Sequence, residues 1–180
     1  MPIVKKQTNW IVFTGAPNSG KSSALERMSF LGYKTVPENA RLFIDQEVSQ
    51  GRAVSDIRAD EQEFQRKILA LNKEVAERFP SEELTFFDRG LGDSIAYFTV
   101  HRMDPAPAIQ AARDIQYRKV FLFDRLASQR NQFGDEQIAS EIEAAIERAY
   151  TDLGYEITRV PAVSIPERVT LILDTLELEG

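Results

Sequence analysis

The sequence contains no cysteine and one histidine, His101, among its 180 residues. Disulfide bonds and thiolate metal sites are therefore excluded, and one imidazole is too few for a histidine-based zinc cluster. No apolar run approaches the ~20 residues that a membrane-spanning helix needs, and residues 1–10 lack the apolar stretch of a secretory signal. We therefore expect a cytoplasmic protein that has no membrane partner.

Positive charge is also scarce. The chain has 22 Lys and Arg against 28 Asp and Glu, which gives a net charge of −6. Because nucleic-acid binding needs clustered basic side chains, we expect no nucleic-acid partner and only a local phosphate site. The sequence shows no repeat, low-complexity tract or Gly/Ser-rich linker that would mark a boundary. We expect a single domain over residues 1–180.

Short apolar runs alternate with segments of helical periodicity. The runs predict five strands, at residues 10–14, 33–36, 84–87, 120–123 and 155–160. Three apolar stripes predict helices, and they consist of Phe64, Ile68, Leu71, Val75 and Phe79, then Ile138, Ile142, Ile146, Ala149 and Leu153, then Val169, Ile172, Leu173 and Leu176. Ser164 and Glu167 form a capping box before the third stripe. Since each crossover between parallel strands needs a helix, the alternation predicts a doubly wound α/β fold with a parallel sheet.

One glycine-rich segment between a predicted strand and a predicted helix fits the pattern G-x-x-x-x-G-K-[ST]. The nucleotide-binding residues that it predicts are Gly15, Ala16, Pro17, Asn18, Ser19, Gly20, Lys21, Ser22 and Ser23. Glycines let successive backbone N–H groups turn toward a phosphate, at the positive end of the following helix. Lys21 would reach the β- and γ-phosphates, and the Ser22 hydroxyl would ligate Mg²⁺. The sequence has no Asn-Lys-x-Asp motif for guanine, which favours ATP.

Phosphoryl transfer also needs an acidic group near Mg²⁺. Asp88 and Asp124 both follow an apolar run, where open α/β sheets place ligand-binding residues, and periodicity does not choose between them. We prefer Asp88 for metal or base chemistry because a cation, Arg89, follows it; the alternative is that Asp88 only caps the next helix. Glu38 follows another predicted strand and is either a second carboxylate at the same rim or a solvated loop residue.

Residues 125–136 have no apolar period and link a predicted strand to a predicted helix. They are either a lid or a mobile surface loop. As a lid, they would bring Arg125 or Arg130 to the nucleotide, where a guanidinium would neutralise charge in the transition state.

Four stretches resemble the AAA-type ATPase/kinase-like P-loop family that includes the nicotinamide riboside kinase domain of bifunctional NAD-biosynthesis proteins. They are residues 13–22, the P-E-N-A-R segment at 37–41, the F-D-R-G segment at 87–90 with Asp93 and Tyr97, and residues 150–161 followed by Arg168. The resemblance implies a five-stranded sheet in the order 2-3-1-4-5 with Asp88 beside Mg²⁺. It also implies a small-molecule acceptor near Glu38, Arg41, Asp93 and Tyr97. Many relatives carry an arginine where this chain has residues 133–136, which leaves Arg130 as its substitute.

Together these features predict a kinase that transfers the γ-phosphoryl group of ATP to a nucleoside-like or other hydroxyl acceptor. The residues to which we assign catalysis are Lys21, Asp88, Arg89, Glu38, Arg41 and Arg130, and the predicted metal ligands are Ser22 and Asp88. Two alternatives stay open, a nucleotide-dependent binding or regulatory module and an ATPase with slow hydrolysis. The acceptor and the oligomeric state are open as well.

Overall fold

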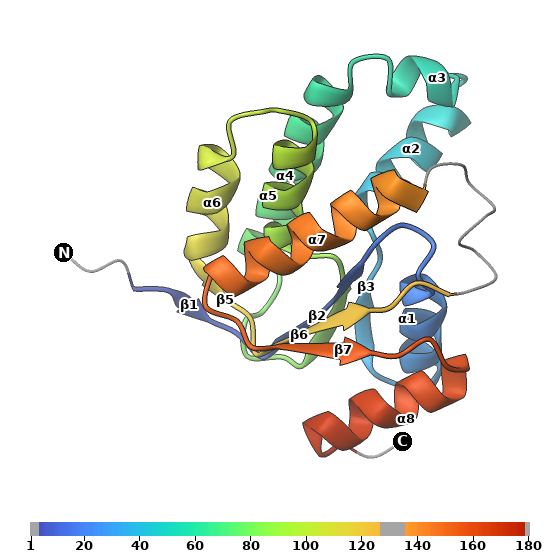
Figure 1. Ribbon diagram of the computed structural model, residues 1–180, viewed down its shortest axis with the longest axis vertical. Helices are drawn as coiled ribbons and strands as arrows, with labels where there is room; N and C mark the ends of the chain where they lie inside the picture. Colours follow the sequence, from blue (N-terminus) through green and yellow to red (C-terminus); the bar gives the residue numbers. More distant parts are fainter. Residues whose placement is uncertain (1–3, 127–135, 179–180) are drawn as a thin grey trace.

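The computed structural model describes residues 4–126 and 136–178. In chain order its elements are β1 (Lys6–Gln7), β2 (Trp10–Gly15), α1 (Lys21–Phe30), β3 (Lys34–Val36), α2 (Asn39–Ser49), α3 (Val54–Ile57), α4 (Glu61–Arg78), β4 (Thr85–Asp88), α5 (Leu91–Val100), α6 (Ala106–Arg113), β5 (Ile115–Gln116), β6 (Lys119–Phe123), α7 (Glu136–Asp152), β7 (Ile157–Val160) and α8 (Ile165–Leu176). Figure 1 shows their arrangement. Among the described residues, no helix has the length and apolar character needed to span a membrane.

A five-stranded parallel sheet runs through the middle of the fold, in the order β3-β4-β2-β6-β7. Counted along the chain, these are the second, third, first, fourth and fifth of the predicted strands, so the order 2-3-1-4-5 is confirmed. The predicted bounds differ from the observed ones by one or two residues. A separate parallel pair, β1 with β5, was not predicted, because strands of two residues carry no readable pattern.

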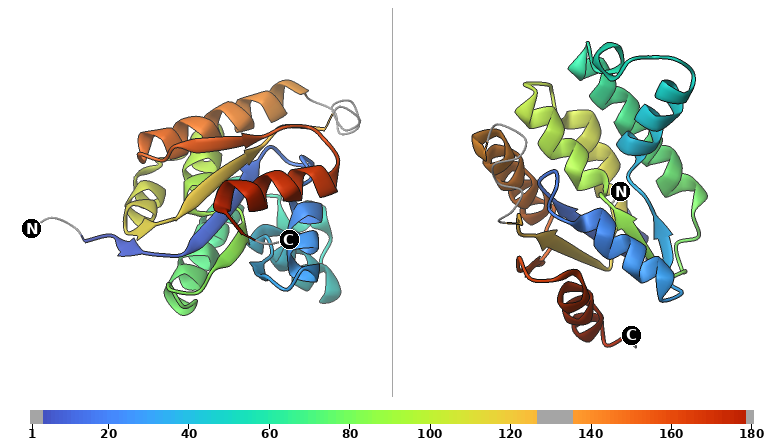
Figure 2. Two further views of the ribbon diagram at one scale, coloured as in Figure 1. Left: turned by 90° about the horizontal axis from the view of Figure 1, so that it is seen from below. Right: turned by 90° about the vertical axis from the view of Figure 1, so that its right-hand side faces the viewer.

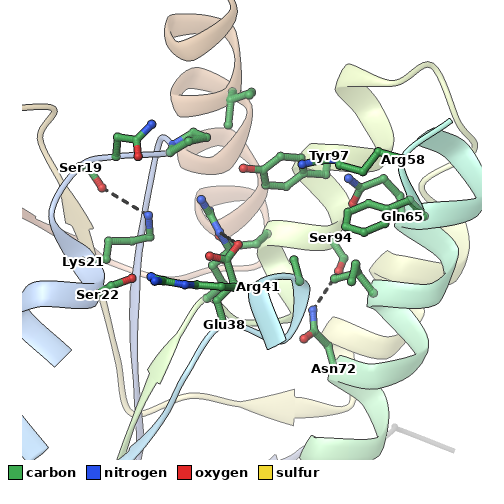
Figure 3. A pocket seen from close by; sticks show the side chains of 18 of the residues that line it. Ser19, Lys21, Ser22, Glu38, Arg41, Arg58, Gln65, Asn72, Ser94 and Tyr97 are labelled. Carbon is green, nitrogen blue, oxygen red and sulfur yellow. Dashed lines mark hydrogen bonds and ion pairs between the residues drawn. The ribbon is translucent and has the colours of Figure 1, made fainter. Parts of the chain in front are cut away.

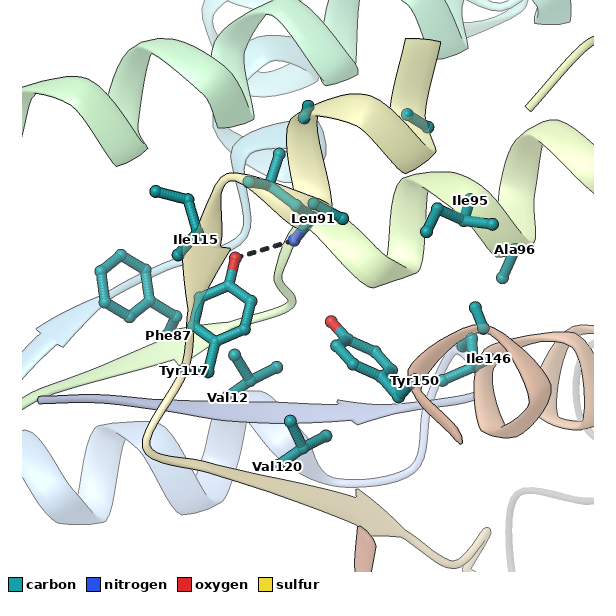
Figure 4. Packing of buried hydrophobic residues seen from close by; sticks show 14 of the residues in the cluster. Val12, Phe87, Leu91, Ile95, Ala96, Ile115, Tyr117, Val120, Ile146 and Tyr150 are labelled. Atoms are coloured by element: carbon teal, nitrogen blue, oxygen red, sulfur yellow. Dashed lines mark hydrogen bonds between the residues drawn. The ribbon is translucent and has the colours of Figure 1, made fainter. Parts of the chain in front are cut away.

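Two layers of helices cover the sheet (Figures 1 and 2). Val12, Val120 and Leu122 face the layer of α4, α5, α6 and α7. This core also contains Tyr117 and Tyr150 (Figure 4). Phe13 and Phe121 face the opposite layer, which consists of α1 and α8. Because these strands are buried on both faces, they read in the sequence as continuous apolar runs rather than as alternating patterns.

The predicted helices are present, with one difference in the second stripe. Ile142 and Ile146 are buried in α7, but Ile138 is 50% exposed, because it lies at the mouth of the cleft described below rather than over the sheet. The capping box before α8 is confirmed: the Ser164 hydroxyl accepts a hydrogen bond from the Glu167 N–H, and the Glu167 carboxylate accepts one from the Ser164 N–H at 3.0 Å.

A third, smaller group of apolar side chains joins α2, α3 and α4 beyond the edge of the sheet. Ile57, Phe64 and Ile68 are its buried members, and Phe43 and Ile44 of α2 pack against them. No residue of α2 is itself buried. This α2–α4 cluster is distinct from the two cores beside the sheet, and it carries one wall of the cleft.

Candidate active site

The predicted site residues that the structure describes meet at the edge of the sheet where all five parallel strands end. β2 leads into the glycine-rich loop, β4 ends at Asp88, and Glu38 lies two residues beyond β3. A cleft of about 700 Å³ opens there, between the loop and α4. Figure 3 shows Lys21 and Ser22 on one side of it and the side chains of α4 and α5 on the other. This is the position where open α/β sheets bind ligands.

The glycine-rich loop curls through three residues with positive φ, Gly15 (+146°), Asn18 (62°) and Gly20 (89°). A Cβ atom on Gly15 would lie 2.8 Å from the Phe123 carbonyl oxygen, so glycine is also required there by space. No side chain in the described part of the chain caps α1, whose first N–H groups follow directly on the loop. Uncapped amides at a helix N-terminus are suited to bind an anion.

Lys21 is buried at the base of this loop. Its ammonium donates to the Ala16 carbonyl oxygen at 3.2 Å and to the Ser19 hydroxyl at 3.4 Å, and both acceptors are neutral. Burial and, to a lesser degree, repulsion from Arg89 lower the pKa of Lys21 to about 8, although Asp88 pulls it upward. A buried ammonium with only neutral hydrogen-bond partners would be stabilised by a bound polyphosphate.

Asp88 and Ser22 lie together, as predicted for metal ligands. The Ser22 hydroxyl donates to Asp88 Oδ2 at 2.8 Å, while Asp88 Oδ1 is buried without a hydrogen-bond partner in the described part of the chain. Burial raises the pKa of Asp88 against the opposing attraction of Lys21 and Arg89. A hydroxyl beside a carboxylate oxygen with an open acceptor position is a donor set that suits Mg²⁺, so the residues present fit the ion.

The structure also settles two alternatives for the carboxylates. Asp88 does not cap the next helix, because Gly90 occupies that position and its N–H is bonded by Asp93 at 3.1 Å. The carboxylate of Asp124, the other strand-end aspartate, accepts a hydrogen bond from Arg159 at 2.7 Å, whereas that of Asp88 accepts one from Ser22 at 2.8 Å. Of the two strand-end aspartates, Asp88 is the one whose side chain is hydrogen-bonded to a loop residue in the described part of the chain.

Arg89 holds several of these groups in place rather than offering a free cation. Its backbone has φ of 74°, a conformation that is uncommon outside glycine and clusters at functional sites. Its guanidinium donates to Glu38 Oε1 at 2.9 Å, to Asp93 Oδ2 at 2.8 Å and to the Gly15 carbonyl oxygen at 3.0 Å. Burial on its own raises the pKa of Glu38, but attraction to Arg89 and Lys21 outweighs it, so this pKa lies below its usual value. Glu38 is therefore an ionised carboxylate facing the cleft.

Asp93 is 2% exposed, and both of its oxygens are engaged. Oδ2 accepts from Thr14 at 2.6 Å as well as from Arg89, and Oδ1 accepts from Tyr150 at 2.5 Å. These bonds join the end of β2 to α5 and α7. A contact between Asp93 and an acceptor stays a prediction. Thr14 and Tyr150 lie in stretches that carry the family resemblance, but their bonds to Asp93 were not predicted, because both residues are far from Asp93 along the chain.

The far side of the cleft contains polar residues of α4 that sequence reasoning missed. Figure 3 shows Gln65 beside Arg58 and Tyr97, and Asn72 beside Ser94, all opposite the loop. Arg58 forms an ion pair with Glu61 at 2.5 Å and lies over the ring of Phe64. A sequence pattern could have predicted this polar wall, because residues 61, 65 and 72 lie on one face of the helix.

Arg41, at the start of α2, extends across the cleft toward Ser22 (Figure 3). Its guanidinium has no hydrogen bond or ion pair to another residue of the ranges that the structure describes. Arg130 and most of the predicted lid at 125–136 lie outside the described residues. Arg125 is described, and it donates to the Ser140 hydroxyl at 3.0 Å and lies 3.4 Å from Glu143, both on α7.

Several solved structures have a fold similar to that of this chain. A thymidylate kinase from Ehrlichia chaffeensis superposes with a TM-score of 0.68 at 14% identity, covering 96% of this chain and 100% of the other. A deoxyadenosine kinase from M. mycoides gives 0.65 at 16% identity, covering 93% and 98%. The NadR protein in complex with NR gives 0.70 at 9% identity, covering 96% of this chain and 50% of NadR. At these identities the comparisons establish the fold.

No curated protein matches the chain in sequence. The model of a protein family, described as the AAA domain, matches residues 10–168, which include the loop, Glu38, Asp88 and Arg168. The family resemblance drawn from the sequence is thereby confirmed. This chain belongs to the AAA domain family.

Proposed function

We propose that this protein is a small-molecule kinase that transfers the γ-phosphoryl group of ATP, with Mg²⁺, to a hydroxyl of a nucleoside-like acceptor. The observation that carries the proposal is the pairing of Ser22 with Asp88, whose second oxygen has no hydrogen-bond partner among the described residues, directly beside Lys21. This polar cluster lies at one end of a cleft that continues past Glu38 to Tyr97, which leaves room for a second substrate. The folds of thymidylate and deoxyadenosine kinases support the same reading.

In this proposal each residue has a role that follows from its position in the cleft. The loop amides and Lys21 bind the phosphates, and Ser22 and Asp88 hold Mg²⁺. The ion, when bound, draws charge from the phosphoryl group being transferred. Arg41, unpaired among described residues and directed at the loop, neutralises charge on that group.

Glu38 is the group that takes the proton in this proposal. Arg89 keeps its carboxylate ionised and fixed in the cleft. As the acceptor oxygen forms its bond to the γ-phosphorus, its proton passes to Glu38, the bond to the β-phosphate oxygen breaks, and ADP leaves. Asp88, which sequence reasoning left as metal ligand or base, is better placed for the metal because Ser22 already donates to it.

The test is ADP formation from ATP and Mg²⁺ with and without a panel of nucleosides. We expect one or more acceptors to raise turnover; turnover indifferent to every acceptor would contradict transfer and favour the ATPase alternative. Glu38→Gln should lower kcat by roughly 10²- to 10⁴-fold and leave ATP binding intact. Asp88→Asn should remove the Mg²⁺ dependence of ATP binding. The control is Glu83→Gln, because the carboxylate of Glu83 is exposed and pairs with Lys34 away from the cleft.

The cytoplasmic location stays a prediction.

A further inference from the structure

Arg168, on the first turns of α8, is a charged side chain with 0% exposure. Its guanidinium donates to three backbone carbonyl oxygens: Nε to Pro161 at 2.9 Å, one terminal nitrogen to Asp124 at 2.7 Å, and the other to Ser19. Its face lies over the ring of Phe123. No carboxylate within residues 4–126 and 136–178 forms an ion pair with it.

The three carbonyl groups belong to three different segments at the carboxyl edge of the sheet. Ser19 is in the phosphate-binding loop, Asp124 follows β6, and Pro161 follows β7. Burying a guanidinium without a directly paired anion is unfavourable, and an apolar side chain of similar size would fill the same space without that penalty. The arrangement therefore indicates a role for the hydrogen bonds themselves.

The bond to Ser19 determines how the next peptide group is turned. No peptide bond in the described residues is cis, and in a trans peptide the C=O of Ser19 and the N–H of Gly20 point in opposite directions. Arg168 lies against the outer side of the loop, since a Cβ atom on Gly20 would be 2.9 Å from its guanidinium, and it does not line the cleft. With the carbonyl held outward on Arg168, the Gly20 N–H is directed to the side of the loop that lines the cleft.

We propose that Arg168 is a positioning residue of the phosphate-binding loop, which orients the Ser19–Gly20 peptide so that its N–H faces the bound polyphosphate. It does so from behind the loop, without contacting the nucleotide, and it fixes the loop against the segments that follow β6 and β7. Arg89 makes the corresponding bond at the other end of the loop, to the carbonyl oxygen of Gly15. The inference rests on the proposed binding of a nucleoside triphosphate at this loop.

The experiment measures binding of Mg²⁺-tripolyphosphate and of Mg²⁺-ATP by calorimetry. Arg168→Met removes all three hydrogen bonds, and Arg168→Lys keeps the charge but cannot bond three divergent carbonyl groups at once. We expect both variants to bind tripolyphosphate roughly 10- to 100-fold more weakly, since misplacement of a binding group by about 1 Å has effects of that size. The control is Arg159→Met, which removes an exposed arginine from the same edge of the sheet and should change affinity less than about twofold.

Steady-state kinetics supply a second readout, in which KM for ATP rises and KM for the acceptor stays unchanged. If the unaltered chain fails to bind tripolyphosphate, the proposed function itself fails. If it binds and folded Arg168→Met binds equally well, the positioning role is wrong. If Arg168→Met does not fold, the affinity of Arg168→Lys for tripolyphosphate is the test. An affinity equal to that of the unaltered chain would overturn the inference.

Discussion

Binding of a polyphosphate should make this protein take up a proton at Lys21. In the free protein, burial holds the pKa of Lys21 at about 8, so at about pH 9 roughly nine-tenths of the molecules carry a neutral amine. Phosphate oxygens beside the amine favour the ammonium and return its pKa above the usual 10.5. Each binding event should then take up about 0.9 proton at pH 9 and about 0.1 at pH 7.

The same equilibrium weakens binding at high pH. Because only the charged fraction of Lys21 is ready for the phosphates, the Kd for Mg²⁺-ATP should be about tenfold higher at pH 9 than at pH 7. Calorimetry in buffers of different ionisation enthalpy measures the number of protons directly. Lys21→Met should bind weakly at both values and take up no proton, while Lys73→Met, which removes an exposed lysine of α4, should behave like the unaltered chain.

The lowered pKa of Lys21 also makes the stability of the nucleotide-free protein depend on pH, in a direction that can be worked out. The folded-state pKa of Lys21 is depressed, so between about pH 8 and 10.5 the unfolded chain binds one proton more than the folded chain. The free energy of unfolding should therefore rise with pH across this window, by up to about 3 kcal/mol from Lys21. Proton uptake below about 0.2 at pH 9, or equal uptake by Lys21→Met, would refute the reasoning.

Three further predictions concern stability. Asp88→Asn should raise the thermal unfolding temperature of the nucleotide-free protein at neutral pH, because burial raises the pKa of Asp88 and the folded state thus disfavours its charge; a lower temperature in thermal melts contradicts this. Gly92→Ala places a Cβ atom 2.5 Å from a ring carbon of Tyr150, and urea unfolding should show a loss of about 1–3 kcal/mol. Ile146→Ala, at a fully buried position of α7, should lose about 2–5 kcal/mol, and Ile138→Ala on the same helix less than about 0.5. Equal losses for the two isoleucines would show that the buried face is misassigned.

The fold and the phosphate-binding loop could be predicted because their signals are local. Each buried strand is an uninterrupted apolar run, and the loop places its glycines, Lys21 and Ser22 within eight consecutive residues. The sheet order came from the family resemblance and not from the strand patterns. The bounds were less certain, since an apolar run such as that before Asp88 does not show which residue makes the last ladder hydrogen bond.

The network around the loop could not be predicted, because it joins residues distant in sequence. Glu38 and Arg89 are 51 positions apart, and Asp93 and Tyr150 are 57 apart. Arg168 was noticed only as part of a family resemblance, and nothing near it in the sequence shows that three carbonyl groups surround it. Interactions of this kind depend on how the strands are ordered, so they appear only once the sheet is assembled.

The α2–α4 cluster has a consequence for how such a protein can change over generations. The wall of the cleft opposite the loop rests on Phe64 and Ile68, which belong to neither core beside the sheet. Substitutions at Gln65, whose side chain bonds to Glu61 of the same helix, can therefore reshape what enters the cleft while the sheet, the loop and the metal-binding pair keep their packing. The residues that select the acceptor and the residues that bind the phosphate are therefore supported by different apolar clusters. Evolution can change the acceptor at this wall while the phosphate-binding residues stay the same.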